Sequence, residues 1–139
     1  MRYLALFAFL PLFIACSSSS SKNITQQVDQ LISEDNYEQA LEVINNVDST
    51  QTEADVTTLR EKIHLNYGIF LEYRGEEGTG MRERMNGALR QYIEVLKINP
   101  DNTKAISEIK QIMSIYSTMP NKAPAEDILE ALRKLGFDY

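Results

Sequence analysis

The sequence is poor in the residues on which most protein chemistry depends. Its 139 residues include one cysteine, one histidine and no tryptophan. A disulfide within the chain is excluded, because Cys16 has no second cysteine with which to pair. His64 stands without another histidine or cysteine, so no ligand set for a transition metal is recognisable. We therefore predict no catalytic residue, no metal site and no cofactor.

Glycine is also scarce, and three of the six glycines lie in the stretch GEEGTG, residues 75–80. This stretch lacks the Lys-Ser/Thr that completes a phosphate-binding loop, and its glutamates would repel phosphate. Glu76 and Glu77 are adjacent in an irregular segment, so nothing holds them at the fixed separation that acid–base catalysis needs. An enzyme remains the least favoured class of function. It would require a pocket that holds His64 together with converging carboxylates.

Basic residues are fewer than acidic residues. The chain has 14 Lys and Arg against 20 Asp and Glu, a formal charge of −6. An acidic surface repels nucleic-acid phosphates and anionic lipid headgroups, so we expect neither as a partner. No small-molecule substrate is expected either.

Strand-like alternation is absent, and apolar residues recur at helical spacing instead. The pattern predicts an all-α chain with helices over about 24–32, 37–47, 52–74, 81–99, 101–116 and 124–136. Asp35 and Asn36 mark a turn between the first two helices, so this pair should form an antiparallel hairpin. Pro100 ends the fourth helix, and Asp101 is expected to cap the fifth. Pro124 is expected to open the last helix, which should end near Gly136.

No apolar run is long enough to cross a membrane. The only candidate, Tyr3–Ala15, has 13 residues, whereas a spanning helix needs about 20. Arg2 precedes it, and the small residues Ala15 and Cys16 close it, which is typical of an export signal. The alternative is that Cys16 is a buried free thiol.

The ending FIAC followed by five serines resembles the lipobox of bacterial lipoprotein precursors. The resemblance implies a signal peptide over 1–15, lipidation of Cys16 as the mature N-terminus, a Ser-rich tether over 16–22 and a helical domain over 23–139. Phe13 stands where leucine is usual. Ser17 follows the cysteine where aspartate would favour the inner membrane, so the resemblance implies an outer-membrane anchor that faces the periplasm. Removal of Arg2 with the signal would take the formal charge to −7.

The stretch ALRQYIEVLKINPDN, residues 88–102, resembles the second helix and exit turn of a tetratricopeptide repeat. Ala88 takes the small position where the two helices of a hairpin touch, Tyr92 and Val95 take inward positions, and Pro100 closes the unit. Earlier, Tyr37, Ala40 and Ile44 in DNYEQALEVI resemble the same region of a preceding repeat, and Tyr67, Gly68 and Leu71 resemble a first helix.

This resemblance implies a tetratricopeptide-like solenoid of about two repeats, formed by antiparallel helical hairpins with capping helices at the C-terminus. Gly68 and Ala88 lie 20 positions apart, which is longer than the family pattern. The surplus falls on residues 74–85, so we expect an insertion there.

Arginines concentrate around this insertion in an otherwise acidic chain. Arg82, Asn86 and Arg90 recur every four residues and share one helix face. One interpretation is a solvated face with ordinary weak ion pairs. The other is a groove for an extended peptide or carboxylate-bearing segment, since arginines bind carboxylates through two parallel hydrogen bonds and tyrosines supply rigid contact area. The candidate partner-binding residues are Tyr67, Tyr73, Arg74, Arg82, Asn86, Arg90 and Gln111, with the concave face around Tyr67 and Gln111 as the alternative location.

The resemblances together imply a membrane-anchored scaffold of the bacterial cell envelope that binds a protein or peptide through the first helices of its hairpins. A subunit of an outer-membrane protein assembly or secretion machine is the alternative. The identity of the partner does not follow from the sequence.

Overall fold

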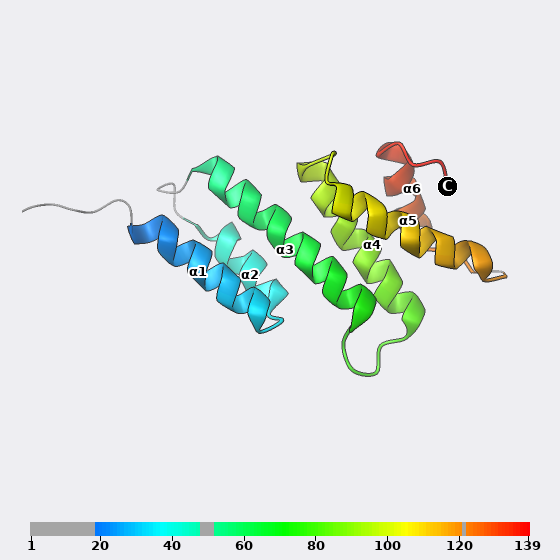
Figure 1. The fold of residues 1–139 in the computed structure, drawn as a ribbon, viewed down its shortest axis with the longest axis horizontal. Helices are drawn as coiled ribbons and strands as arrows, with labels where there is room; N and C mark the ends of the chain where they lie inside the picture. Colours follow the sequence, from blue (N-terminus) through cyan, green and yellow to red (C-terminus); the bar gives the residue numbers. More distant parts are fainter. Residues whose placement is uncertain (1–18, 48–51, 121) are drawn as a thin grey trace, which may run out of the picture.

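The computed structural model describes residues 19–47, 52–120 and 122–139, and the side chains from residue 24 onward. The described ranges contain six helices and no strand, so the predicted all-α class is confirmed (Figure 1). The helices are α1 Ser19–Ser33, α2 Tyr37–Asn45, α3 Glu53–Tyr73, α4 Met81–Ile98, α5 Thr103–Thr118 and α6 Glu126–Lys134.

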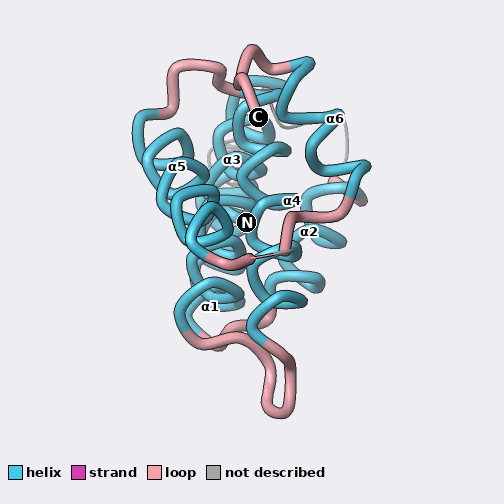
Figure 2. The backbone as a smooth tube through the Cα atoms, turned by 90° about the vertical axis from the view of Figure 1, so that its right-hand side faces the viewer, coloured by secondary structure: helices cyan, strands magenta, loops and turns pink. Residues whose placement is uncertain are grey.

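The helices stack in chain order. Each of the first four helices packs against the next helix along the chain (Figure 1). The last helix, α6, packs on α4 instead of on α5. α1 also contacts α3. Figure 2 shows α1, α3 and α5 toward one side of the molecule and α2, α4 and α6 toward the other. The result is a two-layer row of helices in which one layer consists of α1, α3 and α5.

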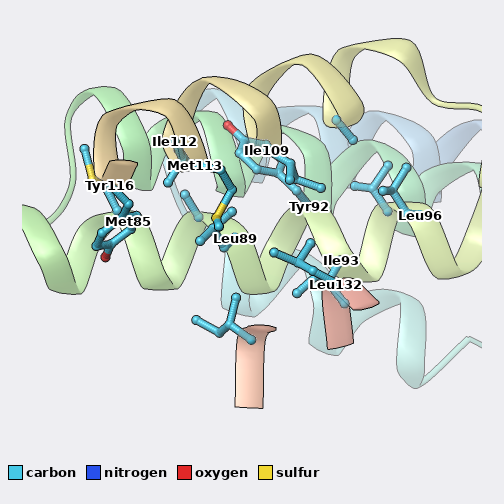
Figure 3. Packing of buried hydrophobic residues seen from close by; sticks show 14 residues of the cluster. Met85, Leu89, Tyr92, Ile93, Leu96, Ile109, Ile112, Met113, Tyr116 and Leu132 are labelled. Carbon is cyan, nitrogen blue, oxygen red and sulfur yellow. The ribbon is translucent and has the colours of Figure 1, made fainter. Parts of the chain in front are cut away.

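Two apolar clusters hold this row together. The larger one is centred on α4, where Ala88, Leu89, Tyr92 and Val95 have no exposed surface, and it extends to α5 and α6 (Figure 3). The smaller one joins α1, α2 and the first half of α3 around Val28, Ala40 and Ile63, together with Tyr37, Ile44 and Leu59. Apolar residues at helical spacing form each buried stripe, as the sequence pattern predicts.

The turn between α1 and α2 lies at the predicted position. Asp35 adopts a positive φ of 60°, and the amides of Asp35 and Asn36 donate to the carbonyls of Ile32 (3.1 Å) and Leu31 (2.8 Å). This is the Schellman arrangement that closes a helix C-terminus, with aspartate in the left-handed position that glycine usually takes. The two helices therefore fold back on one another as a hairpin.

The cap of α5 differs from the expectation. Asn102, not Asp101, is the N-cap, and its side-chain oxygen accepts from the amide of Ala105 at 2.9 Å. Asp101 belongs to the preceding turn, where its amide donates to the side chain of Asn99. Asn99 itself is extended directly before Pro100, which ends α4 as predicted.

The last helix starts slightly later than predicted, at Glu126 rather than at Pro124. Gly136 follows it with φ of 89°, in the left-handed region expected just beyond a helix end. Ile128 and Leu132 are buried, and α6 packs on α4 at the end of the row.

The predicted signal segment and tether lie at the N-terminus, where the described residues begin at Ser19. The signal segment 1–15 and Cys16 lie outside the described residues. The backbone of α1 begins at Ser19, so the last residues of the predicted tether, 19–22, are helical. Serine is a tolerable helix residue, and the amphipathic pattern that starts at Ile24 propagates the helix toward the N-terminus.

Of the residues where we expect an insertion, 74–80 form the loop between α3 and α4. Residues 81–85 belong to the start of α4. The loop is held by Arg84, whose side chain donates to the carbonyl of Arg74 at 3.0 Å. Gly75 has φ of 64°, and a Cβ at this position would lie 2.1 Å from Cδ of Arg84. The arginine thus crosses the loop where only glycine leaves room.

Candidate functional site

The structure distributes the seven predicted partner-binding residues over three places. Tyr73 and Gln111 meet between α3 and α5. Tyr67 and Arg74 lie at the turn that joins α1 and α2. Arg82, Asn86 and Arg90 lie along α4, beneath the connection from α5 to α6.

The first place is a polar network that joins α3, α4 and α5. We call it the α3–α5 cluster; its members are Glu72, Tyr73, Tyr92, Lys104, Glu108 and Gln111. The hydroxyl of Tyr73 donates to Glu108 at 2.9 Å and accepts from the side-chain amide of Gln111 at 2.9 Å. Gln111 also donates to Glu72 at 3.0 Å. Lys104 forms an ion pair with Glu108 on the same helix. Tyr73 is therefore fixed from two sides.

A small residue on α3 decides how α4 enters this cluster. A Cβ at Gly68 would lie 2.5 Å from Cε1 of Tyr92, so only glycine lets the tyrosine ring pass against α3. The ring is fully buried, and its hydroxyl donates to Glu72 at 2.8 Å, one turn beyond Gly68. The sequence thus places a gap and a hydrogen-bond acceptor on the same face of one helix.

The cluster contains two carboxyl groups, Glu72 and Glu108, whose pKa values shift in opposite directions. Burial raises the pKa of Glu72, and the nearby charge of Glu108 raises it further, against the hydrogen bond from Tyr92. Burial also acts to raise the pKa of Glu108, but hydrogen bonds from Lys104 and Tyr73 outweigh it and hold that pKa below its usual value. Glu108 therefore loses its proton more readily than Glu72, although only 3% of its surface is exposed.

The cluster leaves the ring of Tyr73 open to solvent. This side chain is 55% exposed, the largest exposed fraction among the large apolar and aromatic residues of the described ranges. Leu65 and Ile69 precede Tyr73 at four-residue spacing on the same side of α3, and both are only partly buried against the core. A partly accessible apolar stripe thus runs along α3 and ends at Tyr73, which the cluster holds in place.

The second place is a hollow at the turn between α1 and α2. We call it the α1–α2 turn pocket; it is lined by Asp35, Asn36, Tyr37, Glu38, Gln39, Tyr67, Phe70 and Glu76. Tyr67 stacks on Tyr37 with ring centroids 4.9 Å apart. Arg74 lies at the edge of the pocket, paired with Asp35.

In the third place, groups of the chain itself contact the arginines. Arg90 binds Asp127 of α6 at 2.9 Å, and Arg82 donates to the carbonyl of Ala123 at 3.2 Å. Asn86 accepts from the hydroxyl of Tyr116 at 3.0 Å. The stripe exists on one face of α4 as predicted, but groups of the chain itself meet it. The sequence could not show this, because it does not reveal where the last helix packs.

The residues that the sequence interpretation missed are mostly acidic. Glu72 and Glu108 were not singled out, although Glu108 falls on the apolar side of its helix between Ala105 and Ile109, which is a signal of a buried polar group. Asp35 was interpreted only as a turn residue, and its pairing with Arg74 joins positions 39 apart.

His64 is not part of any of these places. Its Nδ1 lies 2.7 Å from the side-chain oxygen of Gln91. The described ranges contain no group of three His, Cys, Asp or Glu side chains that could hold a metal ion. Nor do they contain a helix with the length and hydropathy needed to cross a membrane.

Comparison with family models, curated proteins and solved structures found no match for this chain.

Proposed function

We propose that this protein is a binding scaffold of the bacterial cell envelope, tethered by a lipid on Cys16, which holds a segment of a partner protein on the face formed by α1, α3 and α5. The observation that supports the binding face is the half-exposed ring of Tyr73, held in place by the α3–α5 cluster.

An immobilised aromatic side chain suits recognition for an energetic reason. Ordering a side chain at an interface costs roughly 0.5–1.5 kcal/mol, and Tyr73 is already ordered by Glu108 and Gln111 before any partner arrives. Tyrosine is among the residues that dominate binding energy at protein interfaces. The adjoining stripe of Leu65 and Ile69 supplies apolar contact area along the same helix.

The tether rests on the resemblance of FIAC and the following serines to a lipobox, since Cys16 lies outside the described residues. Each lipid methylene buried in a bilayer contributes about 0.8 kcal/mol to membrane binding. The substitution Cys16→Ala should therefore abolish acyl labelling and move the protein out of the membrane fraction. Labelling that is unchanged in this variant would refute the anchor and leave the binding face to be judged separately.

The binding face can be tested with a photo-crosslinking amino acid. Placed at position 73 in cells, it should give a discrete cross-linked product. Placed at Tyr139, an exposed tyrosine at 42% on the far end of the chain, it should not. In a protein that keeps Tyr73, the variant Gln111→Ala removes one of the two groups that hold its hydroxyl, and we expect weaker capture of the partner in a pull-down while the helical circular dichroism is retained.

Equal cross-linking at both positions, or none at position 73, would contradict the proposed face.

A further inference from the structure

The α1–α2 turn pocket shares no residue with the α3–α5 cluster. Its volume is about 260 Å³. Pockets for drug-sized molecules and cofactors span roughly 300–1,000 Å³, so this hollow matches a single side chain rather than a whole cofactor.

The wall of the pocket is aromatic. Tyr37 stacks on Tyr67 with the rings 8° from parallel, and its centroid lies 5.4 Å from that of Phe70. Tyr37 is almost fully buried, at 5% exposure, and its hydroxyl donates to Asp35 at 3.1 Å. This packing keeps the three rings in place without a ligand.

The rim of the pocket carries three carboxylates and one cation. Arg74 pairs with Asp35 at 2.5 Å, which leaves Glu38 and Glu76 without an ion pair in the described part of the chain. Burial raises the pKa of Tyr67, and the charges of Glu38 and Glu76 raise it further, so both carboxylates act on the pocket wall. The site thus has an uncompensated negative charge.

The chain already shows how a cation fits this wall. The guanidinium carbon of Arg74 lies 4.9 Å from the centroid of the Phe70 ring while its nitrogen pairs with Asp35. Contact of a cation with an aromatic face within about 6 Å is attractive, and a neighbouring carboxylate adds charge pairing. The same two elements, a ring and a carboxylate, recur at Tyr67 with Glu38 and Glu76.

We propose that the α1–α2 turn pocket binds one basic side chain, a lysine or an arginine, of the partner protein, with its alkyl stem along Tyr67 and its charged end between Glu38 and Glu76. A primary ammonium or guanidinium is favoured over a quaternary amine, because only the former donate hydrogen bonds to carboxylates. This inference extends the proposed function, since it names the chemistry of the partner segment, and it rests on that function for the source of the side chain.

The test is a titration that needs no partner. The probes are the N-acetyl N-methylamides of lysine, arginine and norleucine, together with tetramethylammonium chloride, added to the full chain in detergent micelles. Binding is followed by NMR shifts of the tyrosine and phenylalanine rings. We expect saturable shifts with the lysine and arginine probes, and none with norleucine, which has nearly the shape of lysine but no charge.

Three variants locate the effect. Glu76→Gln removes a rim carboxylate and should weaken binding of the lysine probe about fivefold, as expected for loss of one partly exposed charge pair. Glu77→Gln is the matched control, since it changes the charge equally at a neighbouring exposed position that does not line the pocket. Arg74→Gln should strengthen binding, because it removes the competing cation of the chain from Asp35 and Phe70.

Several outcomes would overturn the inference. These are equal shifts with norleucine and lysine, equal weakening by Glu76→Gln and Glu77→Gln, or weaker binding in a folded Arg74→Gln variant. Tighter binding of tetramethylammonium than of lysine would assign the pocket to a free quaternary amine instead. Because the probes are small, a failure here would leave the cross-linking result at Tyr73 unaffected, and the two ideas can fail separately.

Discussion

The close approach of α3 and α4 at Gly68 leads to a prediction whose sign can be worked out from the structure. A Cβ at this position would lie 2.5, 2.8 and 3.0 Å from Cε1, Cδ1 and Cζ of Tyr92. Carbon atoms in contact are ordinarily about 3.5–4.0 Å apart, so Gly68→Ala would require the ring to move by roughly 1 Å. The ring is fully buried and its hydroxyl is bound to Glu72, so little freedom exists for that movement.

Two effects of opposite sign compete in this variant. Replacing glycine by alanine inside a helix stabilises the folded state by about 1 kcal/mol. Overpacking a well-filled core destabilises it by about 1–3 kcal/mol, and the immobile ring places Gly68→Ala at the upper end. We expect a net loss of about 1–2 kcal/mol in the free energy of unfolding. Urea melts followed by helical circular dichroism would measure it.

A matched substitution in the facing helix should have the opposite effect. A Cβ at Gly87 would lie 3.2 Å from Cδ1 of Leu71, the mobile end of a partly buried side chain. Leu71 can yield, so Gly87→Ala should be neutral or more stable by up to about 1 kcal/mol. In a Tyr92→Leu background the obstacle is gone, and Gly68→Ala should no longer destabilise. A Gly68→Ala protein at least as stable as the wild type would refute the close approach.

Ala88 has no exposed surface, so Ala88→Leu should lower the free energy of unfolding by about 1–3 kcal/mol in urea melts; a change under about 0.5 kcal/mol would place the helix crossing elsewhere. Arg82 and Arg90 meet groups of the chain at exposed positions, so their double replacement by alanine should cost about 1 kcal/mol or less and leave the Tyr73 cross-link intact. Loss of that cross-link in the double variant would indicate instead that Arg82 and Arg90 take part in partner binding. The pKa of Glu72 is raised in the folded protein above its ordinary value of 4.5, so its protonation stabilises the fold; this contribution is lost as pH rises through the raised pKa. Urea melts at pH 7 and pH 5 should therefore show the wild type gaining stability relative to Glu72→Gln at the lower pH, and a constant difference would contradict the raised pKa.

Much of the helical pattern was predictable because its causes are local. Thr52 and the apolar spacing after it predict the start of α3, and Pro100 ends α4 because proline pushes the preceding residue out of helical backbone. Asp35 and Asn36 predict the first hairpin because their side chains tolerate turn geometry. The sequence did not decide a helix boundary where two neighbouring residues could both cap the helix. At the start of α5, Asp101 was expected as the N-cap and Asn102 takes that position.

The location of the sites was not predictable in the same way. The stripe of Arg82, Asn86 and Arg90 is correct as a helix face, yet its surroundings depend on the packing of α6, which lies far along the chain. The sequence suggested Tyr73 as part of an arginine-lined groove and Gln111 as part of the concave face. In the structure Gln111 donates a hydrogen bond to Tyr73, although the two residues are 38 positions apart.

The sequence by itself determined the all-α class, the positions of the main turns and the acidic charge, since these follow from spacing, backbone preference and composition. Only the tertiary structure decided which polar groups meet. Glu72 and Glu108 share one cluster, and Arg74 reaches Asp35, because stacking brings together helices that are distant along the chain. The physical reason is that helix formation depends on neighbours within a few residues, whereas a pair of charges across two helices depends on how their apolar faces pack.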